Sequence, residues 1–135
     1  MSTRAIAIDP VLAVRARIEA VHDAAEAAPR PRQARIYGQL PALWDELSRT
    51  RPTTNAGAAI LFDEARDYEG NLEAEGVYLP HLWDRTETKV ASGTLSAKDI
   101  RRVAIGAEIS RKVLGDDHPM GRMLDHVAAF AMTSP

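Results

Sequence analysis

Apolar residues recur at intervals of three and four along most of this chain, and no segment alternates with a period of two. Intervals of three and four place side chains on one face of an α-helix, whereas a half-buried strand requires alternation. The β-branched residues, which favour strands, do not cluster. The sequence therefore predicts an all-α fold, which we expect to be a single-domain bundle of five or six helices.

The chain length allows one core. A chain of 135 residues is the size of one ordinary domain. We expect residues 1–8 to form a flexible N-terminal tail and residues 9–132 to form the helical domain. Aromatic residues make up only 5% of the chain, so the core should consist mainly of aliphatic side chains.

Several residues mark where helices begin. Asp9-Pro10 is a strong start signal, because an aspartate caps a helix and proline fits its first turn. Pro41 falls within a helical pattern and must kink that helix or divide it in two. Further helix starts are expected at Thr53 or Thr54, at Pro80, at Ser96 and at Asp117-His118-Pro119.

The helix expected from Ser96 to Leu114 has two apolar stripes. Val103 belongs to one stripe, and Ile105 lies on nearly the opposite side at 3.6 residues per turn. Either this helix is central in the bundle or its second stripe contacts a partner. The last helix could extend that surface, since methionine adapts to interfaces. The candidate partner interface comprises Ile105, Ile109, Val113, Met120, Met123, Val127 and Phe130.

The start of the third helix is a candidate anion-binding site. Arg49 and Arg51 precede Thr53 and Thr54, so two guanidinium groups, two hydroxyls and free backbone N–H groups could converge on a phosphate or carboxylate. The alternative is structural: a threonine caps the helix, and the small residues 56–58 let another helix approach closely. No phosphate-binding glycine motif is present.

Glu19 and His22 form a candidate metal-binding pair. They are spaced as E-x-x-H, which places both side chains on one helix face. Di-metal helical bundles need two such pairs, and the sequence contains no second one. The alternative is an ordinary surface pair, and no cofactor is expected.

Charge argues against nucleic acid as the main partner. Lys and Arg number 17, and Asp and Glu number 19, which removes most of the attraction to a polyanion. Two basic clusters keep a DNA-binding regulator as an alternative. These clusters are Arg101, Arg102, Arg111 and Lys112, and Arg30, Arg32 and Arg35.

Other classes of function lack their sequence signatures. The chain has no cysteine, which excludes disulfides and thiolate chemistry. It has no G-x-S-x-G nucleophile motif, so a hydrolase is not indicated. No apolar run is long enough to span a bilayer or to form a signal peptide. We therefore expect a cytoplasmic protein, and the sequence contains no catalytic constellation that would indicate an enzyme.

Two stretches resemble known proteins. Pro52-Thr53-Thr54-Asn55-Ala56-Gly57-Ala58, with parts of the first half of the chain, resembles short uncharacterised helical proteins of alphaproteobacteria. This resemblance implies a small bacterial helical protein. It assigns no activity, because the similar proteins are themselves uncharacterised. Residues 107–128 resemble the helix–loop–helix junction of kinesin-light-chain-type tetratricopeptide repeats. No second copy follows at a period of about 34 residues, so this match implies shared loop chemistry between two antiparallel helices.

The sequence as a whole predicts a non-catalytic interaction module. It would self-associate as a homo-oligomer or bind a protein partner through its last two helices. The alternatives are a helical bundle that binds a small anion or a metal, and a DNA-binding regulator.

Overall fold

The computed structural model describes residues 8–79 and 81–133. Within these ranges the regular structure consists of eight α-helices, and no strand is present. The predicted all-α class is confirmed. The expected tail falls outside the described residues except for Ile8, which is exposed, and the helix start expected at Pro80 also lies outside them.

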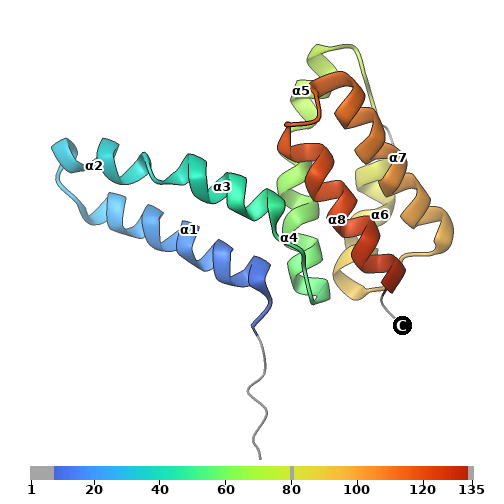
Figure 1. The fold of residues 1–135 in the computed structure, drawn as a ribbon, viewed down its shortest axis with the longest axis horizontal. Helices are drawn as coiled ribbons and strands as arrows, with labels where there is room; N and C mark the ends of the chain where they lie inside the picture. The colour runs from blue at the N-terminus through green and yellow to red at the C-terminus, as the bar shows by residue number, and fades with distance from the viewer. Residues whose placement is uncertain (1–7, 80, 134–135) are drawn as a thin grey trace, which may run out of the picture.

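The first three helices form an arm that projects from the rest of the molecule (Figure 1). Helix α1 (Pro10–Ala27) lies along one side of the arm, and α2 (Arg30–Tyr37) and α3 (Leu40–Arg49) return along the other. The region around Pro41 is thus two helices. Pro41 is the second residue of α3, where its missing N–H breaks no helical hydrogen bond.

The remaining helices form the bundle. They are α4 (Asn55–Arg66), α5 (Glu69–Ala74), α6 (Leu82–Ser92), α7 (Ala97–Leu114) and α8 (Pro119–Thr133). Helix α8 packs between α4 and α7, and α6 packs against α4 and α7. The arm joins this bundle through α1 and α3, which contact α4 and α8 respectively.

Local capping explains where the main helices begin. The side chain of Asp9 accepts a hydrogen bond from the backbone N–H of Val11 at the start of α1. Ser96 and Asp99 form a reciprocal capping box at the start of α7. Both arrangements satisfy N–H groups that have no partner within the helix, and they confirm the helix starts predicted at these residues.

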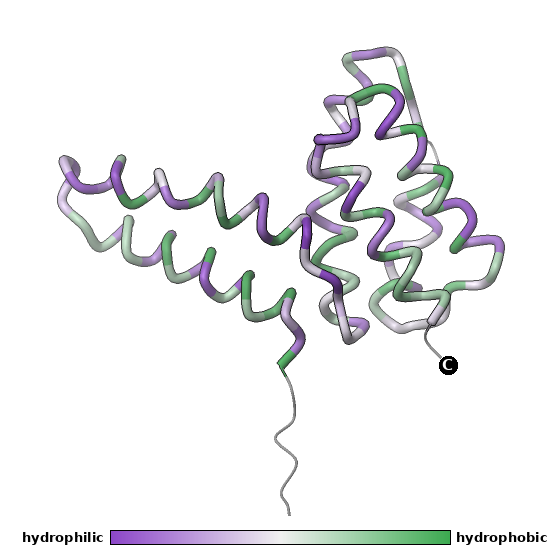
Figure 2. Tube along the Cα trace, viewed as in Figure 1, coloured by the Kyte–Doolittle hydropathy of each residue, from purple (hydrophilic) through white to green (hydrophobic). Residues whose placement is uncertain are grey.

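The core runs through the bundle and into the near half of the arm. Phe62, Leu61 and Leu124 are almost fully buried in the bundle, and Ile18 and Leu47 continue the core between α1 and α3. Helix α2 contributes no buried residue. Hydrophobic and hydrophilic positions alternate around the turns of most helices (Figure 2), as expected for helices with one apolar face.

None of the described helices combines the length and the apolar character that a bilayer-spanning segment requires.

Candidate interaction groove

The predicted anion-binding site is occupied by a carboxylate of the chain itself. Asp9 is 2% exposed, and its Oδ2 accepts hydrogen bonds from the backbone N–H groups of Thr53 and Thr54 at 3.1 and 2.9 Å. The Thr54 hydroxyl donates a third at 2.6 Å. The same carboxylate thus caps α1 and binds the segment that begins α4. The prediction of an external anion at this place is corrected: the positive helix end is already neutralised.

Gly57 makes this contact between α1 and α4 possible. A Cβ atom at Gly57 would lie 2.1 Å from Asp9 Oδ2, well inside van der Waals contact. The glycine of the Thr-Thr-Asn-Ala-Gly segment therefore leaves room for a carboxylate. The close approach expected of another helix occurs at Gly57, where the nearest atoms belong to the side chain of Asp9, the N-cap residue of α1.

The two arginines of the predicted anion site do not point to a common ligand. Arg49 Nε lies 3.0 Å from Asp45 Oδ2 on the same helix. Arg51 is exposed and lies near His126 of α8. Thr53 and Thr54 contact Asp9 instead, so the four predicted residues do not form one site.

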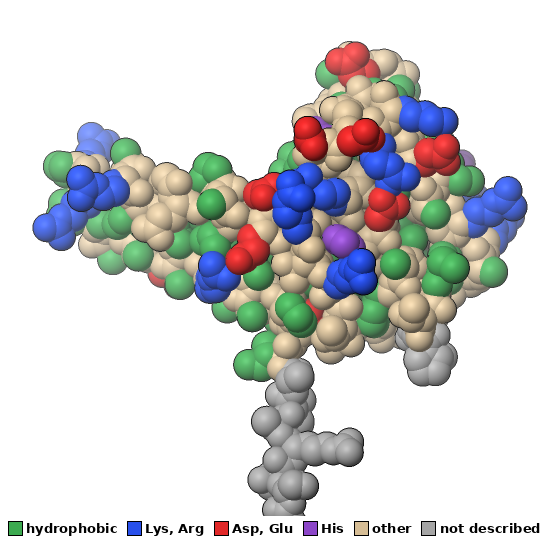
Figure 3. Space-filling model, viewed as in Figure 1, with side chains coloured by type: hydrophobic (Ala, Val, Ile, Leu, Met, Phe, Trp, Pro, Cys, Tyr) green, Lys and Arg blue, Asp and Glu red, His purple; other side chains and the backbone are tan. Residues whose placement is uncertain are grey.

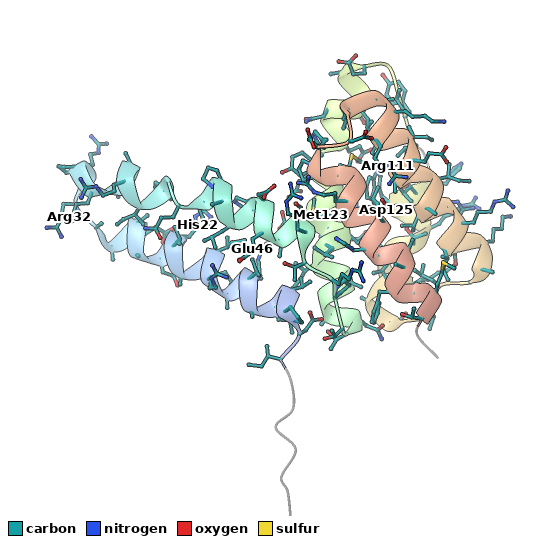
Figure 4. The ribbon with its side chains drawn as sticks, in the orientation of Figure 1. His22, Arg32, Glu46, Arg111, Met123 and Asp125 are labelled. Atoms are coloured by element: carbon teal, nitrogen blue, oxygen red, sulfur yellow. The ribbon has the colours of Figure 1, made fainter. Side chains whose placement is uncertain are left out.

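The predicted metal pair lies on the exposed surface of the arm. Glu19 forms an ion pair with Arg15 at 3.5 Å. The His22 ring meets the Tyr37 ring edge-on, with 5.9 Å between centroids, and Figure 4 shows His22 on the arm, well away from the bundle. Within the described ranges no third His, Asp or Glu completes a metal-binding group.

Burial divides the predicted partner interface. Met120, Met123 and Val127 are buried within the chain, because this face of α8 packs against α4 and α7. The prediction that these three residues form part of a partner interface is therefore corrected: they belong to the core. The second stripe of α7 remains at the surface: Ile105 is 46% exposed and Ile109 is half-buried. Val113 and Phe130 are half-buried and pack against the core.

A groove lies beside the exposed part of this stripe, between α7 on one side and Tyr78, Leu79 and the start of α6 on the other. Its volume is about 460 Å³. Its apolar residues include Leu79, Leu82 and Ile105, and Tyr78 borders it with 67% of its surface exposed. We call this feature the α7 groove.

Three cations border the α7 groove: Lys98, Arg101 and Arg102. Arg102 is 3.3 Å from Asp99 of the capping box. Lys98 and Arg101 form no ion pair with any side chain in the described part of the chain. The groove therefore combines an apolar floor with uncompensated positive charge.

Two of the four basic residues of the α7 cluster considered for DNA form ion pairs with acidic side chains. Arg111 of α7 pairs with Asp125 of α8, and Figure 4 shows these residues on facing helices. Lys112 pairs with Glu108 at 3.1 Å. Basic side chains also gather at the tip of the arm, where Arg32 lies (Figures 3 and 4).

A second hollow lies where the arm meets the bundle, and it is mainly acidic. Its volume is about 510 Å³. It contains Glu64, whose pKa is raised by burial although the Arg15 side chain, to which Glu64 is hydrogen-bonded, opposes the shift. Arg122 of α8 crosses the hollow to Asp45 Oδ1 at 3.1 Å and to Ser48 Oγ at 2.9 Å. These contacts fasten the arm to the bundle, and Figure 3 shows the resulting mixture of charges.

Two histidines lie near this junction. Burial lowers the pKa of His118 and of His126, and the charges of Arg122 and Arg51 respectively lower it further. Nδ1 of His118 accepts a hydrogen bond from the Met120 backbone N–H at 3.1 Å. Protonation of Nδ1 would remove this acceptor at the start of α8.

We expect the protein to lose stability when the pH falls from about 7.5 to about 5.5. Because the folded pKa values of His118 and His126 lie below the unfolded value, the unfolded chain binds more protons in this range. The contribution of the two neutral histidines to the free energy of unfolding is fully present above the unfolded pKa. It is lost as the pH falls toward the folded pKa.

Thermal unfolding of the wild type and of the His118→Asn, His126→Asn double variant would test this. The unfolding temperature should fall less steeply with decreasing pH in the double variant than in the wild type. The double variant retains Glu64 and the other carboxyl groups. An unchanged slope would mean that the histidines do not cause it.

Tyr78, Leu79 and Lys98, which border the α7 groove, were not among the residues of any predicted site. The sequence around Tyr78 has no helical period, and Lys98 is simply one charge near a helix start. The only available signal was the proximity of Lys98 and Arg101 to Ile105 on one helical face, at spacings of three and four.

Searches for similar chains among protein-family models, curated proteins and solved structures find no match. The resemblances of residues 52–58 and 107–128 therefore stay predictions. Function is inferred from the geometry of the described residues.

Proposed function

We propose that this chain is a non-catalytic interaction module that binds a protein partner through the α7 groove. The observation that supports the proposal is that Tyr78 and Ile105, both exposed, border the same groove. Five large hydrophobic side chains of the described residues are exposed, and two of these five border this one groove. Scattered exposed apolar residues need no explanation, whereas contiguous ones with a polar rim are typical of contact sites.

Charge favours a different protein over a second copy of the chain. In a symmetric dimer the same patch occurs on both sides of the interface. If the two α7 helices ran parallel, Lys98 and Arg101 of one copy would lie close to the same cations of the other, and such like-charge contacts disfavour association. The predicted homo-oligomer is therefore the alternative form of this proposal.

Light scattering over a wide range of protein concentration separates the two forms. We expect a constant mass near the 14.8 kDa of one chain. A stable dimer that Ile105→Asp dissociates would instead assign the groove to self-association. The exposed Ala16 on α1 offers a matched control, Ala16→Asp, which should leave the mass unchanged.

Site-specific crosslinking tests the groove as a contact surface. A photo-reactive phenylalanine analogue in place of Ile105 or Tyr78 should give a protein adduct in the cells that produce the chain. The same analogue at Ala16 serves as the control, because that side chain is also exposed but lies on the arm. Equal yields at the three positions, or no adduct at Ile105 and Tyr78, would refute the proposed function.

A further inference from the structure

The placement of charge on α7 is unusual for a helix. Lys98 and Arg101 lie within its first five residues, and Arg102 follows. The N-terminus of a helix carries partial positive charge, so cations there are unfavourable for the helix itself. Asp99 is the only acidic residue of the first turn, and it is engaged with Ser96, Lys89 and Arg102.

The positive charge and the apolar surface belong to one continuous face. Lys98, Arg101 and Ile105 are separated by three and four residues, which places them in line along α7. All three border the α7 groove, opposite Tyr78 and Leu79. A ligand lying along this face would meet positive charge beside the first turn of the helix and apolar side chains one turn further on.

We propose that the α7 groove binds an acidic amphipathic segment of a partner protein. Carboxylates of the segment contact Lys98 and Arg101, and its apolar side chains lie between Ile105 and Tyr78. This inference rests on the proposed function and names the chemistry of the partner. Charge complementarity favours an acidic segment over a neutral or basic one, because the dipole of α7 and the uncompensated cations attract anions at the same end of the groove.

The apolar floor distinguishes this occupant from a nucleic acid. A nucleic acid would gain from Lys98 and Arg101, and a base could stack on Tyr78, but the aliphatic side chains of Leu79 and Ile105 would gain little from its phosphates. The acidic hollow at the root of the arm and the overall net charge of −2 further oppose a long polyanion. A peptide that carries both carboxylates and apolar side chains uses the whole groove.

The test is a binding assay with the full chain and labelled designed peptides. The first peptide is a helix with leucine on one face and glutamate flanking it. In the second peptide lysine replaces glutamate, and in the third serine replaces leucine. We expect binding of the first peptide only, with an affinity that falls as salt is added. A short single-stranded oligonucleotide serves as the nucleic-acid probe and should bind at least about tenfold more weakly than the first peptide.

A charge-reversal variant identifies the site. Lys98→Glu, Arg101→Glu should weaken binding of the first peptide by about tenfold or more, and Ile105→Ser should weaken it as well. The matched control is Arg30→Glu, Arg32→Glu, which makes the same charge change on exposed residues of α2. This control should retain most of the binding.

Stability separates a binding role from a structural one. Because Lys98→Glu, Arg101→Glu puts acidic residues at the start of α7, the variant should unfold at the same temperature as the wild type or higher. Loss of peptide binding by a variant of undiminished stability would support the proposal. Equal binding of the lysine peptide or of the oligonucleotide, or equal loss in the Arg30, Arg32 control, would overturn it.

Failure of this inference and failure of the proposed function give different results. If crosslinking at Ile105 captures a partner that Lys98→Glu, Arg101→Glu still binds, the groove is a contact surface but its occupant is not acidic. If crosslinking at Ile105 and Tyr78 yields no specific adduct, both proposals fail.

Discussion

The Asp9→Ala variant is expected to lose about 3 kcal/mol of unfolding free energy. Removal of this carboxylate leaves the backbone N–H groups of Val11, Thr53 and Thr54 without their acceptor. Loss of a helix cap alone costs about 1 kcal/mol. Each buried donor left without a partner costs about 1–3 kcal/mol, reduced where water can reach it.

Chemical denaturation at neutral pH measures this loss. Asp23→Ala is the matched control, because Asp23 is an exposed residue of the same helix and should change the stability by less than about 0.5 kcal/mol. A loss of similar size in both variants would show that the carboxylate of Asp9 does not hold α1 against the start of α4.

Gly57 offers a sharper version of the same test. In the wild type, Gly57→Ala should be destabilising because the new Cβ overlaps Asp9 Oδ2. In the Asp9→Ala background this atom is absent, and alanine exceeds glycine in helix propensity by about 1 kcal/mol. Gly57→Ala should then be neutral or stabilising. Additive effects in the double-mutant cycle would contradict the contact between these two residues.

The Phe62→Ala variant is expected to lose about 3–5 kcal/mol of unfolding free energy. Phe62 is 1% exposed and its ring packs against that of Trp83, with 5.1 Å between centroids. The substitution opens a cavity between α4 and α6, where the surrounding helices can relax only in part. The protein should remain helical but should unfold at a much lower denaturant concentration.

The second phenylalanine provides the control. Phe130 is half-buried near the end of α8, so Phe130→Ala removes less contact and should cost less than half as much. Equal losses in the two variants, measured by the same denaturation experiment, would mean that the core is not centred on Phe62.

Helix starts were predictable because they depend on residues next to one another. Asp9-Pro10, and Ser96 with Asp99, carry their own capping chemistry, and the structure places helices where these residues indicate. Pro41 was predicted either to kink one helix or to divide it in two, and the structure has two helices. Local sequence suffices for such features because the hydrogen bonds span only a few residues.

The occupant of the α4 start could not be predicted in the same way. Arg49, Arg51, Thr53 and Thr54 indicated a site for an anion, and the anion that Thr53 and Thr54 bind is Asp9, which lies 45 residues from Thr54 along the chain. No periodic pattern connects two positions so far apart. The apolar stripe of α8 was equally ambiguous, because Met123 and Val127 have the same spacing whether they face a core or a partner.

The second helix gives the molecule a convenient point of attachment. Since α2 has no buried side chain, additions beside it disturb no core packing, and exposed connections of this kind tolerate insertions. Gly38 and Gln39, both exposed, follow α2 part-way along the arm, away from α7 (Figure 1). A fluorophore or an affinity tag inserted there would leave the α7 groove unobstructed, and the chain could be immobilised in a known orientation.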